Sequence, residues 1–372
     1  MIKQLFRVIL FQTLLFFFAA SGIFAVDFYW EEAELFSAQG GTFPVSAYSS
    51  NFSVLAWQEV TPNRDSSLSA GGFINIHLAV KTASGDWEQR GVVAGPYAFS
   101  GTEPSIISLV IDNRDRIIIA AADGTHTGIH ISQDRGLSFT VKTLDMGTAS
   151  SVAPRIYVRA DGGYFLFVTR SMAEAMSIYL ARSDDGVSWT PFELFVQESS
   201  LSFNFLPTHA YIGRRDIVFF QSISMGIDSA TTFQLFFKVS DDGGKTWSAS
   251  NRFTTFNDPV VQTQAPPNNF DNQRPHLTKY GNNIFLVWER HYTTQTPQIY
   301  SAVIDANGSL VGSVERVNSE EAYCNNPVGF IYKAAPTVVW FDNRRGNNRI
   351  ILAMREAFGW ENHQLSSVST EA

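Results

Sequence analysis

The chain has 372 residues, 14% of them aromatic, and a formal net charge of −8 at pH 7. An acidic chain without a basic stretch argues against nucleic acid or an anionic membrane surface as its main partner. A single cysteine, Cys324, excludes a disulfide within the chain, so stability must come from packing.

The first 25 residues predict an export signal. Lys3 and Arg7 give a positive start, and the apolar run over residues 8–20 is too short to span a bilayer. We expect cleavage after Ala25 and no transmembrane segment after signal removal. The remaining residues, 26–372, are expected to form a single domain that is secreted, periplasmic or attached to the cell surface.

A repeat organises the rest of the chain. Six Xaa-Pro pairs recur about every 50 to 70 residues, and each opens a run of alternating apolar residues. Proline at the start of a strand costs no ladder hydrogen bond, so each pair predicts the start of a first strand. The pairs are Phe43-Pro44, Glu103-Pro104, Ala153-Pro154, Leu206-Pro207, Arg274-Pro275 and Asn326-Pro327.

Each pair is followed by the same series of predicted elements. An apolar second strand comes next, over residues 54–57, 117–121, 164–168, 217–220, 284–288 and 337–341. An alternating third strand follows, over residues 74–80, 128–132, 177–182, 233–239, 298–304 and 349–354. A turn and a more polar fourth strand close each unit. Four antiparallel strands repeated six times predict an all-β fold, a six-bladed β-propeller. Two segments compete to complete the ring, an N-terminal strand over 30–36 or an outer strand over 360–366.

Three of the turns after a third strand share the pattern S-x-D-x-G-x-[ST]-[WF], the second copy being one residue shorter. Aspartate and glycine suit a hairpin turn, and the aromatic residue anchors the returning strand. Serine and aspartate side chains satisfy backbone groups of such turns, so we assign these residues a structural role. They are Ser132, Asp134, Gly136 and Phe139, then Ser183, Asp185, Gly186 and Trp189, then Ser240, Asp242, Gly244 and Trp247.

This pattern resembles the Asp-box, or BNR repeat, of the sialidase-like β-propellers. The resemblance implies an arginine cluster that holds a substrate carboxylate, an aspartate acid/base and a tyrosine nucleophile paired with a glutamate. Asp65 follows a strand that resembles the second strand of the first sialidase blade, and Tyr323 precedes the first strand of the sixth unit. The resemblance thus gives the catalytic candidates Asp65 and Tyr323 and the ligand-binding candidate Arg274. Their place at the same end of the predicted strands adds Glu289, with Glu174 as the alternative, as the partner of the tyrosine, and Arg170, Arg290 and Arg344 as further ligand-binding candidates.

Other interpretations remain open. The stretch Gly41-Thr42-Phe43-Pro44-Val45 keeps the proline of the sialidase Phe/Tyr-Arg-Ile-Pro motif but lacks its arginine. Asp65 also fits a solvated loop residue, Tyr323 a strand cap, and Glu289-Arg290 an ion pair that shapes a loop. No residue spacing indicates a metal, and no cofactor is expected.

Two functions therefore compete. The first is recognition of a carbohydrate, including a sialylated or other acidic glycan, by a degenerate or divergent exo-glycosidase. The second is a non-catalytic scaffold that binds a surface protein.

Overall fold

The computed structural model describes residues 42–62, 72–82, 85–99, 106–122, 126–145, 150–172, 175–196, 202–224, 232–254, 270–292, 296–320, 322–343 and 349–365. These residues all belong to one compact unit, Gln39–Ala372. The signal over residues 1–25, the strand over 30–36, Asp65, Glu103-Pro104, Glu174 and Arg344 lie outside the described residues.

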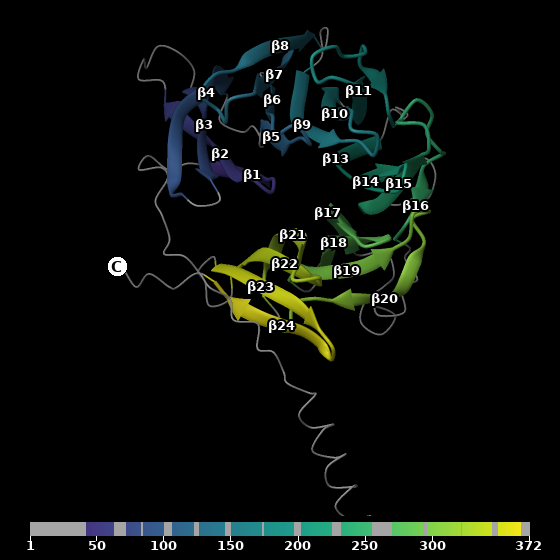
Figure 1. Cartoon of the computed structure of the whole chain (residues 1–372). Coiled ribbons are helices and arrows are strands. Elements are labelled where there is room, and N and C mark those ends of the chain that lie inside the picture. The colour runs from purple at the N-terminus through teal and green to yellow at the C-terminus, as the bar shows by residue number, and fades with distance from the viewer. Residues whose placement is uncertain are drawn as a thin grey trace, which may run out of the picture. The chain divides into compact units, whose positions relative to one another are not determined.

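The described residues form antiparallel sheets of short strands that follow one another in chain order (Figure 1). Four sheets have four strands each: β1–β4, β5–β8, β17–β20 and β21–β24. The segment between them, β9–β16, forms one sheet of eight strands. No helix in the described part of the chain has the length and apolar character needed to cross a membrane. The strands are β1 Thr42–Tyr48, β2 Phe52–Pro62, β3 Gly72–Thr82, β4 Trp87–Phe99, β5 Ile107–Ile111, β6 Ile117–Ala122, β7 His126–Ser132, β8 Thr140–Asp145, β9 Ser150–Val158, β10 Tyr164–Met172, β11 Ala175–Ser183, β12 Glu193–Leu194, β13 Ser202–Ile212, β14 Arg215–Ser224, β15 Gln234–Ser240, β16 Asn251–Arg252, β17 Phe270–Tyr280, β18 Asn283–Tyr292, β19 Gln298–Ile304, β20 Leu310–Arg316, β21 Cys324–Tyr332, β22 Ala335–Asp342, β23 Arg349–Glu356 and β24 Gly359–Gln364.

The predicted propeller with four-stranded antiparallel blades is confirmed, but the expected division into six separate blades is not. The structure has four separate four-stranded blades, whereas β9–β12 and β13–β16 are joined into one sheet. The join is a single parallel bridge between Met176 of β11 and Phe203 of β13. One backbone bridge between neighbouring antiparallel groups is enough to merge them, and residue pattern does not reveal it.

Neighbouring groups of strands pack face to face through apolar side chains, because successive residues of a strand point to opposite faces. Strand β18 shows this alternation. Ile284, Leu286 and Trp288 pack toward β14 and β15, whereas Phe285 and Val287 pack toward β22 and β23. Five buried clusters of this kind join consecutive groups from β1–β4 through to β21–β24.

The Xaa-Pro pairs do not begin the innermost strands as expected; they lie inside them. In β1, β9, β13, β17 and β21 the pair sits at a β-bulge, where two residues face one residue of the neighbouring strand. A bulge interrupts the ladder, so proline's missing N–H costs nothing there. The residue before each proline has a left-handed backbone with φ of 49° to 54°, a strained conformation for a residue other than glycine. These residues are Phe43, Ala153, Leu206, Arg274 and Asn326.

The three Ser-x-Asp turns share one hydrogen-bond pattern. In the first, the Ser132 hydroxyl accepts a hydrogen bond from the Gly136 N–H at 2.7 Å and donates one to Asp134 at 2.7 Å. Asp134 in turn accepts from the Ser138 N–H at 2.9 Å. These bonds hold the pKa of Asp134 at about 2, and the pKa values of Asp185 and Asp242 are lowered to about 2 in the same way.

Candidate functional site

Two sizeable cavities lie at opposite strand ends, and a third, of about 490 Å³, lies between the blades β17–β20 and β21–β24. A central cavity of about 470 Å³ lies among the innermost strands, and another of about 570 Å³ lies beside the turns at residues 159–163 and 241–245. The strained bulges distinguish the central cavity, because all five left-handed residues that precede a proline line it. Bulges and strained residues concentrate where a fold has to aim side chains at a ligand. The central pocket is therefore the candidate functional site.

The lining of the central pocket mixes apolar surface with long hydrogen-bond donors. Three phenylalanines and a methionine supply the apolar part, and two arginines, two glutamines, an asparagine and a threonine supply the polar part. Ligand sites typically combine an apolar wall with a few polar groups that fix orientation. The lining residues are Phe43, Ala153, Arg155, Thr169, Met176, Phe205, Leu206, Gln221, Phe233, Gln273, Arg274 and Asn326.

A buried carboxylate, Glu289 of β18, lies directly behind this lining. It is fully buried, and its oxygens accept hydrogen bonds from Arg274 Nη1 at 2.9 Å and 3.2 Å. The imidazole Nε2 of His291 lies 2.6 Å from its Oε2, and the backbone N–H of Asn326 donates to its Oε1. The structure thus joins two sequence candidates, Glu289 and Arg274, and connects them to two pocket bulges.

The preceding sheet provides a neutral counterpart of Glu289. Gln221 holds the corresponding position in β14, and its side-chain oxygen accepts a hydrogen bond from the Arg274 N–H at 2.8 Å. Glu289 accepts the equivalent hydrogen bond from the next inner strand, β21, through the Asn326 N–H. A carboxamide therefore suffices to join an inner strand to its neighbour. The hydrogen bond between the strands therefore does not require the negative charge of Glu289.

A second acidic residue, Asp271, shares the face of Glu289. Asp271 pairs with His291, and Gln273 pairs with Glu289, in the register of β17 and β18, so the four side chains lie on one face. The backbone N–H of Phe233, a pocket residue, donates to Asp271. Burial raises the pKa of Asp271 above its usual value, although the Phe233 hydrogen bond and the His291 charge oppose the shift. Sequence reasoning missed Asp271, because only strand register places it beside His291.

The remaining candidates among the described residues are not part of the pocket lining. Arg290 is 1% exposed on the opposite face of β18, where its guanidinium stacks on Tyr300 and donates to Asn272 at 3.0 Å. Arg170 donates to the Tyr179 hydroxyl at 3.1 Å and stacks on the same ring. Tyr323 precedes β21, half exposed, and exchanges backbone and side-chain hydrogen bonds with Asn343.

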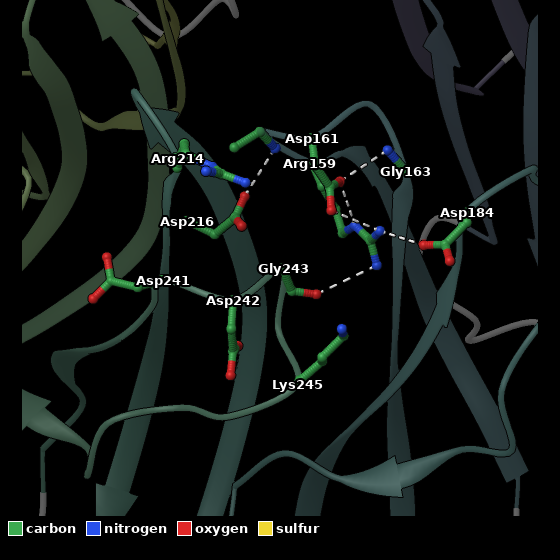
Figure 2. A pocket seen from close by; sticks show the side chains of 11 residues that line it. Arg159, Asp161, Gly163, Asp184, Arg214, Asp216, Asp241, Asp242, Gly243 and Lys245 are labelled. Atoms are coloured by element: carbon green, nitrogen blue, oxygen red, sulfur yellow. Dashed lines mark hydrogen bonds and ion pairs between the residues drawn. The ribbon is translucent and has the colours of Figure 1, made fainter.

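The cavity beside residues 159–163 and 241–245 is lined largely by charged residues, and Arg159 bonds to two of the aspartates (Figure 2). The buried Arg159 donates to Asp161 at 2.9 and 3.0 Å, to Asp184 at 2.5 Å and to the Gly243 carbonyl at 3.3 Å. Asp216 accepts from the Ala160 N–H at 3.1 Å. These bonds join neighbouring turns, so the charged side chains that form them have a structural role. In the described part of the chain, no group of histidine, cysteine and acidic side chains is arranged to hold a metal ion.

Comparisons with known proteins show the fold. No protein-family model matches the chain, and no curated protein matches it in sequence. A protein of unknown function from Dyadobacter fermentans aligns over 85% of this chain and 95% of its own, with a TM-score of 0.57 and 14% identity. An α-L-arabinanase from Penicillium chrysogenum complexed with arabinobiose aligns over 69% of this chain and 79% of its own, with a TM-score of 0.51 and 15% identity.

A GH93 α-L-arabinofuranosidase from Fusarium graminearum, also complexed with arabinobiose, gives a TM-score of 0.52 at 14% identity, with the same coverage. At such low identity these similarities show a β-propeller architecture and leave the chemistry to the site itself.

Proposed function

We propose that this chain binds a saccharide in its central pocket. The observation that carries the proposal is the convergence of five strained bulges on one cavity that combines phenylalanine rings with arginine, glutamine and asparagine donors. Aromatic rings pack against the apolar faces of sugars, and the donors suit hydroxyl groups. Two structurally similar propellers were crystallised with arabinobiose, which supports a glycan as the ligand class.

We also infer that the pocket hydrolyses a glycosidic bond, using two carboxyl groups in different environments. Most glycoside hydrolases pair an acid with a nucleophile or base. Asp271, whose pKa is raised by burial, supplies the acid, and Glu289, the partner of Arg274 and His291, supplies the nucleophile or base. A sialidase-like alternative would use Asp65 and Tyr323 instead, and variants of these two residues separate the alternatives.

Two further expectations belong to this proposal. Residues 1–25 would direct export, which would bring the propeller to glycans outside the cytoplasm. The antiparallel groups β9–β12 and β13–β16 would serve as two blades despite the Met176–Phe203 bridge, which would give a six-bladed propeller.

The test is a glycan array and a hydrolysis screen with the purified full chain. The substrates are arabinan oligosaccharides, sialosides and uronic-acid oligosaccharides. Phe205→Ala and Phe233→Ala should abolish binding, whereas Lys245→Ala in the cavity beside residues 241–245 should bind as the wild type does. Binding that survives both phenylalanine substitutions would refute a central site. Hydrolysis lost in Asp65→Asn and Tyr323→Phe but retained in Glu289→Gln and Asp271→Asn would favour the sialidase-like alternative.

A specific observation favours a second function, binding of a protein partner. The blades β1–β4 and β21–β24 expose large apolar side chains, namely Tyr48 at 80%, Phe73 at 47%, Phe341 at 44% and Ile350 at 38%. Among the described residues, no buried cluster joins these two blades as clusters join the others. Exposed apolar side chains on two blades that share no buried cluster offer contact area to a protein partner. A pull-down that depends on Tyr48 and Phe341 but not on Phe205 would support this function.

A further inference from the structure

The central pocket contains an arginine that has no acidic partner among the described residues. Arg155 follows the bulge of β9 and lines the cavity, and its Nη1 donates to the carbonyl of the neighbouring Pro154 at 2.9 Å. Within the described part of the chain it forms no ion pair with a carboxylate. By contrast, the buried Arg159 and the pocket residue Arg274 both have acidic partners.

The described residues around Arg155 do not supply a negative charge. Burial lowers its pKa, since removal from water disfavours the charged form. His276, on a neighbouring inner strand, has its pKa lowered to about 4 by burial and by the charge of Arg155, so it is neutral at pH 7. Tyr157 is partly buried, and removal from water raises its pKa, so its phenol is neutral as well. Arg274 adds a second cation, although Glu289, which also contacts His291, pairs with it from behind.

A partly buried guanidinium that lines a pocket is stabilised by an anion that meets its planar, forked donors. The protein as a whole carries a charge of −8, so a local positive centre in its pocket departs from the rest of the molecule. Low-dielectric walls concentrate such a local field on the ligand. The simplest source of the missing negative charge is the ligand itself.

We propose that the central pocket selects a saccharide that carries an anionic group, a carboxylate or a sulfate, and that Arg155 binds this group. The proposal rests on the proposed function, because it names the class of saccharide bound at the same site. It differs from what the structurally similar proteins display, since the arabinobiose in those complexes is uncharged. It also assigns the anion to a residue that the sequence resemblance did not indicate.

The experiment compares matched sugars by titration calorimetry on the full chain at low salt. The probes are oligogalacturonate, the corresponding neutral galactan oligosaccharide, and the same galactan carrying 6-sulfate. We expect at least one anionic form to bind about tenfold or more tightly than the neutral form, and this advantage to shrink as salt is raised. Whether uronate or sulfate binds more tightly identifies the anionic group.

Variants then assign the effect to Arg155. Arg155→Gln should bring anionic binding down to the level of the neutral sugar, Arg155→Lys should keep part of the preference, and Lys245→Gln should change nothing. Thermal melting of each variant checks that it is folded. The wild-type comparison of charged with neutral sugars needs no variant, so the proposal stays testable even if Arg155→Gln does not fold.

Three results would overturn the proposal. Equal affinity of the wild type for charged and neutral sugars would refute the anion preference while leaving saccharide binding intact. Binding of no sugar of either kind would refute the proposed function, and this inference with it. The second Xaa-Pro pair, Glu103-Pro104, lies outside the described residues. Tighter uronate binding by Glu103→Gln than by the wild type would show that this carboxylate neutralises Arg155.

Discussion

Two substitutions of Glu289 separate the effect of its hydrogen bond with the Asn326 N–H from the effect of its negative charge. Glutamine at this position keeps an oxygen that can accept from the Asn326 N–H, as Gln221 does for the Arg274 N–H. Glu289→Gln therefore loses only the ion pairs with Arg274 and His291. The side chain of Arg274 is 42% exposed, so solvent screens this pair, and we expect a loss of about 1 kcal/mol in unfolding free energy.

Glu289→Ala removes the hydrogen bond with the Asn326 N–H as well. The Asn326 N–H then lacks its partner, which costs about 1–3 kcal/mol, and truncation of a fully buried side chain leaves a cavity. We expect a total loss of about 3–4 kcal/mol. The alanine variant should thus be destabilised by about 2 kcal/mol or more beyond the glutamine variant.

Urea denaturation of both variants measures this difference. Gln221→Ala is the matched control, because it removes the uncharged acceptor of the Arg274 N–H. Equal destabilisation by glutamine and alanine would refute the structural part of the argument. The hydrolysis assay tests the other part, because loss of a catalytic carboxylate should lower the rate by about 100-fold or more. A Glu289→Gln enzyme that hydrolyses its substrate at the wild-type rate would refute the catalytic assignment.

Three further predictions concern stability. Gly244 has a φ of 79° and a Cβ there would overlap the ring of Phe165, so Gly244→Ala should lower the unfolding free energy by about 3 kcal/mol. Gly213 has a φ of 58° and open space around it, so Gly213→Ala should lower it by only about 1 kcal/mol. Equal urea midpoints for the two variants would contradict this. His276 stays neutral in the fold down to a pKa of about 4, whereas the unfolded chain binds a proton near pH 6.5, so stability should fall by about 3 kcal/mol as pH drops from 6.5 to 4. Denaturation at pH 7.5, 6 and 5 measures this loss, and His276→Gln should flatten it. The pKa of Asp242 is lowered to about 2, so its contribution is present above pH 4 and is lost as pH falls toward 2; an acid transition unchanged in Asp242→Asn would contradict this.

The sequence predicted the fold class and most strand positions, because alternation and turn residues are local signals. The predicted strand over 284–288, for example, lies within β18. The five described Xaa-Pro pairs correctly marked inner strands, yet their left-handed bulges were not predicted. A positive φ at Phe43 or Leu206 goes against the preference of the residue type, and only the surrounding fold imposes it.

The site was harder to predict than the fold because it depends on which face a side chain occupies. Sequence reasoning grouped Glu289 and Arg290 by their shared loop, but consecutive strand residues point to opposite faces, and Arg290 is buried against Tyr300. Arg155 and Asp271 went unnoticed for the same reason. Arg155 does carry a local signal, since it immediately follows the Ala153-Pro154 bulge.

The most direct test of a saccharide site in the central pocket is hydrogen–deuterium exchange of the full chain, with and without the best glycan from the array. If the glycan binds in the central pocket, exchange should slow at residues 205–206 and 273–274, which flank it. Exchange at residues 241–245, beside the cavity of about 570 Å³, should not change. Protection at 241–245 alone, or no protection despite saturating glycan, would contradict a site in the central pocket.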